Sequence, residues 1–172
     1  MKNHQPYNIV LCGLMAAIIV LCSWISFPMG EIVFTLQTFA IAITLFLLGG
    51  KAGSSCIFIY LVMGGIGVPV FAGLQGGISS LLGPTGGFIL GFGLWGGVYW
   101  LLTTTLGRKF RMPAMFIGLI LCYALGSAWI CFFYGYPYIV AVAKCVLPFI
   151  LPDCVKIVLA WFLAKRLKRF VY

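Results

Sequence analysis

Two ionisable side chains lie three residues apart in the last apolar segment of the chain. Asp153 and Lys156 occur in LPFILPDCVKIVLA, residues 147–160, and the 172-residue chain has only one other acid, Glu31. Residues at positions i and i+3 share one face of a helix, so the carboxylate and the amine are expected close together. Ionisable groups inside a membrane segment are costly unless they pair with one another or serve a ligand. The pair therefore predicts a polar binding site.

Helix capping by Asp153 is the structural alternative. Pro152 is typical of a first helical turn, and Asp153 would then cap the last helix or lie near the positive end of its dipole. Lys156 favours a ligand site, because a cap does not require an amine on the same face. Glu31 precedes the second apolar segment and is interpreted as a solvated interfacial carboxylate.

The composition indicates an all-α, polytopic membrane protein. Hydrophobic residues make up 63% of the chain and charged residues 8%, whereas soluble domains are about half apolar and about a quarter charged. Long apolar runs recur along the whole chain, which we treat as a single transmembrane domain, 1–172. Glycine- and proline-containing breaks separate them. The predicted six transmembrane helices are 8–28, 34–50, 53–69, 86–106, 113–134 and 151–167.

The basic residues predict the orientation of these helices. The net charge is +9, but the Lys and Arg residues lie mainly at the ends of apolar runs, which indicates membrane topology and not nucleic-acid binding. Nine of the eleven fall on one side of the six-helix arrangement: Lys2, Lys51, Arg108, Lys109, Arg111, Lys165, Arg166, Lys168 and Arg169. Both termini are therefore expected in the cytoplasm.

A glycine-rich connection, 68–85, joins the third and fourth predicted helices on the outer side. It has no charge and several apolar residues, with Gln75, Ser79 and Thr85 among its polar groups. One interpretation is a simple linker. The other is a re-entrant lid over a ligand pocket, because non-helical backbone at membrane depth must be buried or line a cavity. On helix four, Trp95, Tyr99 and Trp100 are the aromatic residues expected nearest the pocket.

Several classes of function are not supported by the sequence. It has no GxxxxGK[ST] loop for ATP, and no HExxH or GxSxG pattern. With two carboxylates in the chain, catalysis is not expected. The seven cysteines lack ligand spacing and are read as small apolar residues, and His4 is alone, so no metal site and no cofactor are expected.

Four segments carry a family resemblance. FTLQTFA (34–40), GGIGVPVFAG (64–73), GPTGGFILGF (83–92) and LPFILPDCVKIVLA (147–160) occur in an order and spacing that resemble the BioY family. These are biotin-binding S-components of energy-coupling-factor (ECF) transporters in prokaryotic cell membranes. The combination of GPTGGFILGF with a terminal Asp-x-x-Lys is specific, and the resemblance extends from about residue 8 to residue 165.

The resemblance implies a six-helix S-component that binds biotin under the loop between helices three and four. It also implies a partner ECF module of one transmembrane T-component and two ATPases. That T-component would contact small residues of the first helix, here Gly13 and Ala17, which form a small-xxx-small face without the family's usual AxxxA pattern.

Biotin has a ureido group with two N–H donors and one carbonyl acceptor, an otherwise apolar ring system and a valerate carboxylate. Asp153 can accept from a ureido N–H, and Lys156 can bind either the ureido oxygen or the valerate. Further polar contacts are expected from Gln75, Ser79, Thr85 and Gln37, while Gly86 and Gly87 would allow close backbone approach. Two alternatives are an S-component for another vitamin, thiamine or riboflavin, and a membrane scaffold that does not transport.

Overall fold

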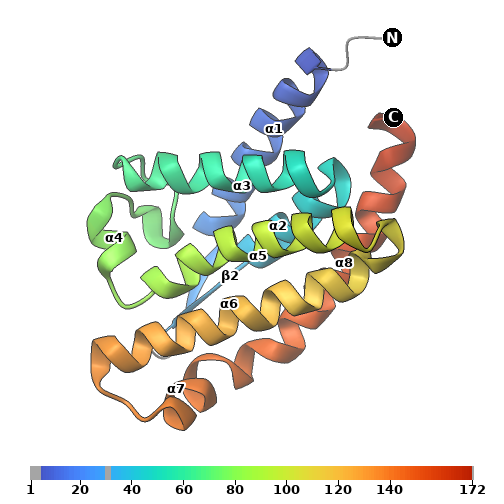
Figure 1. The fold of residues 1–172 in the computed structure, drawn as a ribbon. Coiled ribbons are helices and arrows are strands. Elements are labelled where there is room, and N and C mark those ends of the chain that lie inside the picture. Colours follow the sequence, from blue (N-terminus) through green and yellow to red (C-terminus); the bar gives the residue numbers. More distant parts are fainter. Residues whose placement is uncertain (1–4, 30–31, 172) are drawn as a thin grey trace.

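The computed structural model describes residues 5–29 and 32–171. Helices dominate, and they are arranged as in Figure 1. The elements are α1 (Gln5–Trp24), β1 (Ser26–Met29), β2 (Ile32–Thr35), α2 (Gln37–Leu48), α3 (Gly50–Gly65), η1 (Ala72–Leu74), α4 (Ile78–Leu82), α5 (Gly86–Thr105), η2 (Arg108–Phe110), α6 (Arg111–Tyr134), α7 (Tyr138–Cys145) and α8 (Leu147–Val171).

The helices form two packed groups that are joined through α3. In one, α5 packs on α6 and α3; in the other, α2 packs on α8 and α1, and α3 also packs on α1 and α2. The buried centre is α2, where Ala40, Ile41 and Leu45 have no solvent exposure. After its first turn, helix α2 is apolar except for Thr44, whose hydroxyl donates to the Ala40 carbonyl of the same helix. This part of α2 can therefore be surrounded by other helices instead of presenting a polar face to water.

The outward faces of the helices remain apolar. Phe132 on α6 is 87% exposed, and Leu151 on α8 is also exposed. Three helical spans have the length and composition to cross a membrane: Gly86–Thr105, Arg108–Tyr134 and Leu147–Arg169. Two shorter apolar helices, Ile9–Trp24 and Gln37–Leu48, lie beside them. A large exposed apolar surface of this kind is typical of a membrane protein.

A β-hairpin replaces the predicted end of the first helix. Strand β1 pairs with β2 antiparallel, with Ser26 opposite Thr35 and Phe27 opposite Phe34. The sequence Ile-Val-Phe-Thr favours a strand because β-branched and aromatic residues pack well on a pleated surface. Proline at residue 28 is compatible with a two-stranded ribbon, in which both strands are edges. The fold is mostly helical, as expected, but the first helix ends at Trp24 and not at residue 28.

The last helix begins earlier than its sequence predicts. An additional short helix, α7, precedes it, and α8 begins at Leu147, so that Pro148 occupies the first turn and Pro152 lies inside the helix. Proline at 152 lacks the backbone donor that would bind the carbonyl of Pro148. Asp153 is thus beyond the first turn of α8, and the structure excludes the capping interpretation of this residue.

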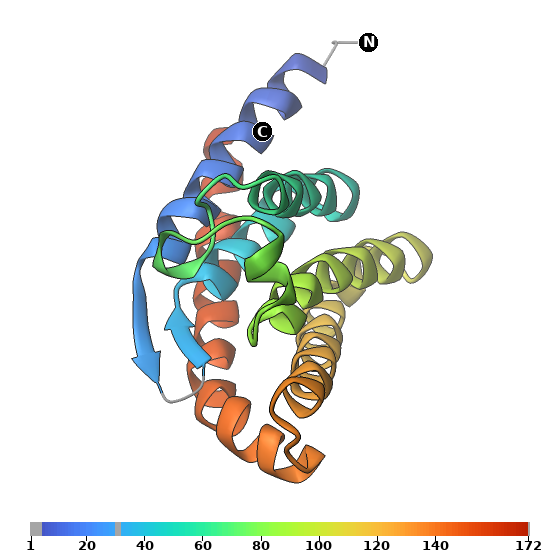
Figure 2. The ribbon, with the colours of Figure 1, turned by 90° about the vertical axis from the view of Figure 1, so that its left-hand side faces the viewer.

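One end of the molecule carries the hairpin, α4 and α7, and Figure 2 views the molecule from that end. The opposite end carries the turn between α5 and α6 together with the C-terminal end of α8 (Figure 1). Glu31, Lys2 and His4, discussed from the sequence, lie outside the described residues.

Candidate functional site

A cavity of about 470 Å³ lies between the hairpin, the connection 68–85 and helices α2, α5, α6 and α8. This volume is within the range of small-molecule sites, roughly 300–1,000 Å³. The residues that line it are Ser26, Pro28, Ile32, Val33, Thr35, Gln37, Thr38, Phe71, Ala72, Gly73, Gln75, Pro84, Thr85, Phe88, Ile89, Phe92, Leu119, Cys122, Tyr123, Cys145, Phe149, Asp153 and Lys156. Most of them are apolar, and five of the polar residues are joined by hydrogen bonds around α8: Thr35, Thr38, Tyr123, Asp153 and Lys156.

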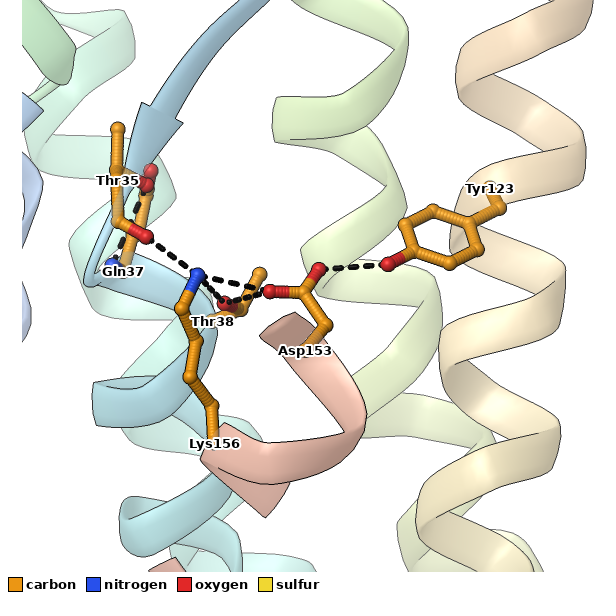
Figure 3. A network of polar contacts seen from close by, with 6 residues as sticks. All are labelled: Thr35, Gln37, Thr38, Tyr123, Asp153 and Lys156. Atoms are coloured by element: carbon orange, nitrogen blue, oxygen red, sulfur yellow. Dashed lines mark hydrogen bonds and ion pairs between the residues drawn. The ribbon is translucent and has the colours of Figure 1, made fainter. Parts of the chain in front are cut away.

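Asp153 is the acceptor at the centre of this polar group. Its side chain is buried, and its Oδ1 accepts hydrogen bonds from Thr38 at 2.8 Å and from Lys156 Nζ at 2.8 Å. Its Oδ2 accepts a 2.6 Å hydrogen bond from the Tyr123 hydroxyl (Figure 3). A carboxylate has about four lone-pair positions, so three donors leave one position for a ligand.

Lys156 is held by acceptors on every available donor. Its ammonium lies 2.7 Å from the Thr35 carbonyl, 3.2 Å from the Thr38 hydroxyl and 2.8 Å from Asp153 Oδ1. The same ammonium lies 3.9 Å from the centre of the Phe34 ring, a cation–π contact. An ammonium has three N–H donors, so a ligand can bind Lys156 only by replacing one of these partners.

Secondary structure explains why these side chains meet. Asp153 and Lys156 are one helical turn apart on α8, as their spacing predicts. Thr35 ends β2, and Thr38 is in the first turn of α2, so the hairpin brings both next to α8. Tyr123 reaches the same carboxylate from the middle of α6.

Thr35, Thr38 and Tyr123 were not among the site residues expected from the sequence. A signal for the two threonines is present in the sequence, because they are three residues apart within FTLQTFA, the segment in which Gln37 alone is predicted as a site residue. Tyr123 interrupts the apolar run LILCYALG, and a tyrosine hydroxyl in such a run usually has a hydrogen-bond partner. The identity of that partner depends on the packing of α6 relative to α8.

Gln37 connects the cavity wall to the connection 68–85. Its amide Nε2 donates to the Tyr60 hydroxyl at 2.6 Å, and Tyr60 donates to the Val70 carbonyl at 3.0 Å. Ser23 donates to the same carbonyl at 2.6 Å. The Gln37 carbonyl oxygen has no hydrogen-bond partner among the described residues, and the residue lines the cavity. It is a second acceptor available to a ligand.

The connection 68–85 is ordered by short elements and by packing. Phe71 is buried against Gly64, where any side chain would overlap with the Phe71 ring, and its own ring packs edge-on against Tyr60 at 5.6 Å. Gly77 has a φ of 89° before α4, a conformation that favours glycine. Phe71, Gln75 and Thr85 from this connection and its end all line the cavity.

Five of the eight expected ligand-binding residues line the cavity: Asp153, Lys156, Gln37, Gln75 and Thr85. The structure places the other three, Ser79, Gly86 and Tyr99, outside the cavity lining. Ser79 is exposed on α4. Gly86 faces the Leu81 carbonyl, and Gly87 faces Trp129, so these glycines allow close packing within the protein and not the close approach of a ligand that we expected.

Tyr99 is fully buried but lies outside the cavity lining, and its ring contacts Phe46 edge-on. Trp95, also fully buried, donates to the Met115 carbonyl at 2.9 Å. These aromatic residues lie outside the cavity lining, one to three turns farther along α5 than Phe88, Ile89 and Phe92, which line it. The adjacent Trp100 is partly exposed.

Gly13 and Ala17, expected at a partner interface, lie on the exposed face of α1. The neighbouring apolar residues Val10, Leu14 and Leu21 are exposed on the same helix. Within the described part of the chain, no group of three or more His, Cys, Asp or Glu residues is arranged to hold a metal ion.

Comparisons with known proteins agree with the four segments quoted above. The model of the BioY family matches residues 1–172. The chain is 36% identical to the Biotin transporter BioY of Thermotoga maritima over 94% of this chain and 96% of that protein. It is 38% identical to the Probable biotin transporter BioY of Pyrococcus horikoshii, over 94% and 96% of the two chains.

The fold has a counterpart among solved structures. A crystal structure of the S-component for biotin from an ECF-type ABC transporter superposes with a TM-score of 0.88 at 24% identity, covering 98% of this chain and 94% of that one. The similarity of fold is therefore extensive although the sequences have diverged. With the family model matching the whole chain and relatives above 30% identity, the chain belongs to the BioY family.

Proposed function

We propose that this protein binds biotin with high affinity and takes it up across the prokaryotic cell membrane as the substrate-specific subunit of an ECF-type transporter. The observation that carries this proposal is the buried Asp153–Lys156 pair in the wall of a mostly apolar 470 Å³ cavity. The names of the relatives support the same substrate. The protein is a transporter subunit and not an enzyme.

Biotin is complementary to the polar groups that remain available. The free lone-pair position of Asp153 and the unpaired carbonyl oxygen of Gln37 are two acceptors for the two ureido N–H groups. Gln75 and Thr85, which line the cavity without a hydrogen bond from their side chains to a described residue, are donors for the ureido or valerate oxygens. Because its donors are occupied, Lys156 orients Asp153 and balances its charge, and contacts the ligand only after releasing one partner.

The distribution of the basic residues supports a specific arrangement in the membrane. We propose six membrane crossings, with α1, α2 and α3 as the shorter ones beside α5, α6 and α8. Both termini then lie in the cytoplasm of a multi-pass protein. The connection 68–85 then lies on the outer side and acts as the lid, because it contributes Phe71 and Gln75 to the cavity lining.

The partners proposed are an ECF T-component and two ATPases, since the chain has no ATP-binding loop of its own. The exposed face around Gly13 and Ala17 is the proposed contact for the T-component. Co-purification of a tagged chain with the module tests this proposal, with Gly13→Leu expected to reduce recovery of the T-component. Unchanged recovery would place the contact elsewhere.

Equilibrium binding to detergent-purified protein tests the substrate. Biotin is expected to bind more tightly than about 1 μM, and thiamine and riboflavin are expected not to compete. Displacement of biotin by either vitamin would favour an S-component for that vitamin. The absence of binding or thermal stabilisation by any of the three would favour a membrane scaffold.

A further inference from the structure

A second cavity lies at the opposite end of α8 from Asp153. Its volume is about 180 Å³, and it lies near the beginning of α6 and the last turns of α8. Six residues line it: Phe46, Arg111, Trp161, Ala164, Lys165 and Lys168. Three of the six are basic, and the others provide an apolar floor.

The positive charges in this cavity are not balanced by any carboxylate in the part of the chain that the structure describes. Arg108 and Arg111 are close enough to repel the ammonium of Lys168. Lys165 lies 5.4 Å from the centre of the Trp161 ring, a cation–π contact that supplies no negative charge. Among the described residues, no ion pair joins Arg111, Lys165 or Lys168 to an acid.

Asp153 is also too far away to balance these charges. It lies on the same helix fifteen residues before Lys168, about 22 Å at 1.5 Å per residue, and it is already paired with Lys156. Within residues 5–29 and 32–171, the basic groups of the cavity therefore have no counterion, and an anionic ligand would supply one.

We propose that this cavity binds the phosphate of an anionic phospholipid. A guanidinium presents a planar pair of donors that matches phosphate oxygens, and two ammonium groups add charge. Basic pockets between membrane helices are suited to anionic headgroups. Free phosphate would satisfy the same charges, but the apolar floor of Phe46, Trp161 and Ala164, together with exposed Phe162 and Leu163 nearby on α8, favours a lipid.

Native mass spectrometry of the detergent-purified full chain tests the site, with phosphatidylglycerol, phosphatidylcholine and inorganic phosphate added in separate arms. The pocket variant is Arg111→Gln/Lys168→Gln. The matched control is Lys109→Gln/Arg166→Gln, which removes the same charge at exposed positions outside the cavity lining. We expect the wild-type chain to prefer phosphatidylglycerol over phosphatidylcholine at least fivefold, the pocket variant to lose this preference, and the control to retain it within twofold.

Equal losses in the two variants would overturn the proposal in favour of diffuse attraction between charges. Equal binding of phosphatidylglycerol and phosphatidylcholine to the wild-type chain would also overturn the proposal. An acidic surface of another protein would then be the remaining partner for the basic cavity. If inorganic phosphate binds as strongly as phosphatidylglycerol, the proposal of a lipid ligand is overturned in favour of a free anion. The melting temperature of each variant without ligand verifies folding. Because the measured quantity is lipid binding and not biotin binding, the result is independent of the proposed function. Biotin binding at the other end of α8 is expected to be unchanged.

Discussion

Tyr123 on α6 donates a 2.6 Å hydrogen bond to Oδ2 of Asp153 on α8, and both residues line the larger cavity. Helix α6 packs mainly on α5, whereas α8 packs mainly on α2. The bond therefore joins the two packed groups of helices at the cavity (Figure 3). This hydrogen bond between Tyr123 and Asp153 holds the carboxylate that we propose as the acceptor for a ureido N–H of biotin.

Replacing Tyr123 with Phe is expected to weaken biotin binding roughly tenfold. The substitution removes one of three donors to Asp153 and keeps the ring, and a hydrogen bond to a charged group is worth about 1.5–3 kcal/mol. Isothermal titration calorimetry measures the change. Tyr134→Phe on the same helix is the control, because Tyr134 is exposed and lies outside the cavity lining. Equal affinities of the two variants would contradict the role of Tyr123.

Substitutions in the Asp153–Lys156 pair are expected to affect protein stability and biotin binding differently. Lys156→Met leaves a buried carboxylate without its counterion, and the free energy of unfolding is expected to fall by on the order of 3 kcal/mol. Asp153→Asn/Lys156→Met removes both charges, so most of that stability should return. Asp153→Asn alone and the double variant should each bind biotin at least tenfold more weakly, because the charged acceptor is missing.

Thermal unfolding and equilibrium biotin binding, measured on all three variants, provide the test. Recovery of biotin affinity together with stability in the double variant would mean that the pair is structural.

Gly64→Ala is expected to destabilise the connection 68–85. A methyl group at this position overlaps with the buried Phe71 ring, so the ring must move, at a cost of about 1–3 kcal/mol. Limited proteolysis of the connection and the melting temperature measure the effect. Gly65→Ala is the matched control, because its added carbon would meet only Leu81 Cδ1 at an ordinary 3.4 Å. Equal proteolysis rates and equal melting temperatures of the two variants would show that the packing of Phe71 on Gly64 does not determine the stability of the connection.

Tyr60→Phe is expected to lower stability by about 1 kcal/mol and to speed biotin release. It removes the acceptor of the Gln37 amide and one of two side-chain donors to Val70. The biotin dissociation rate and the melting temperature are the measurements. Tyr99→Phe makes the same change at a fully buried tyrosine whose hydroxyl has no partner in the described chain. It should be neutral or stabilising, and a similar loss in both variants would exclude a specific role for the Tyr60 hydroxyl.

The sequence predicted the feature of the site that depends on local geometry alone. Two residues three apart on any helix share a face, so Asp153 and Lys156 were expected as a pair before their surroundings were known. The segments 34–40, 64–73, 83–92 and 147–160 also identified the family, which the comparisons confirm. The long apolar runs also predicted membrane helices, because the hydrophobicity of a segment depends only on the residues that it contains.

Tertiary structure decided which groups surround that pair. The hairpin spans the break expected between the first two helices and includes residues 26–28 and 34–35, which were expected to be helical. The strand propensity of 32–35 is realised only when a second strand pairs with it. The start of α8 at Leu147 moved Asp153 out of the first helical turn, and the packing of α6 brought Tyr123 to its second oxygen. These contacts join residues 30 to 121 positions apart. Local spacing carries no information about such distances, because they depend on how whole helices pack.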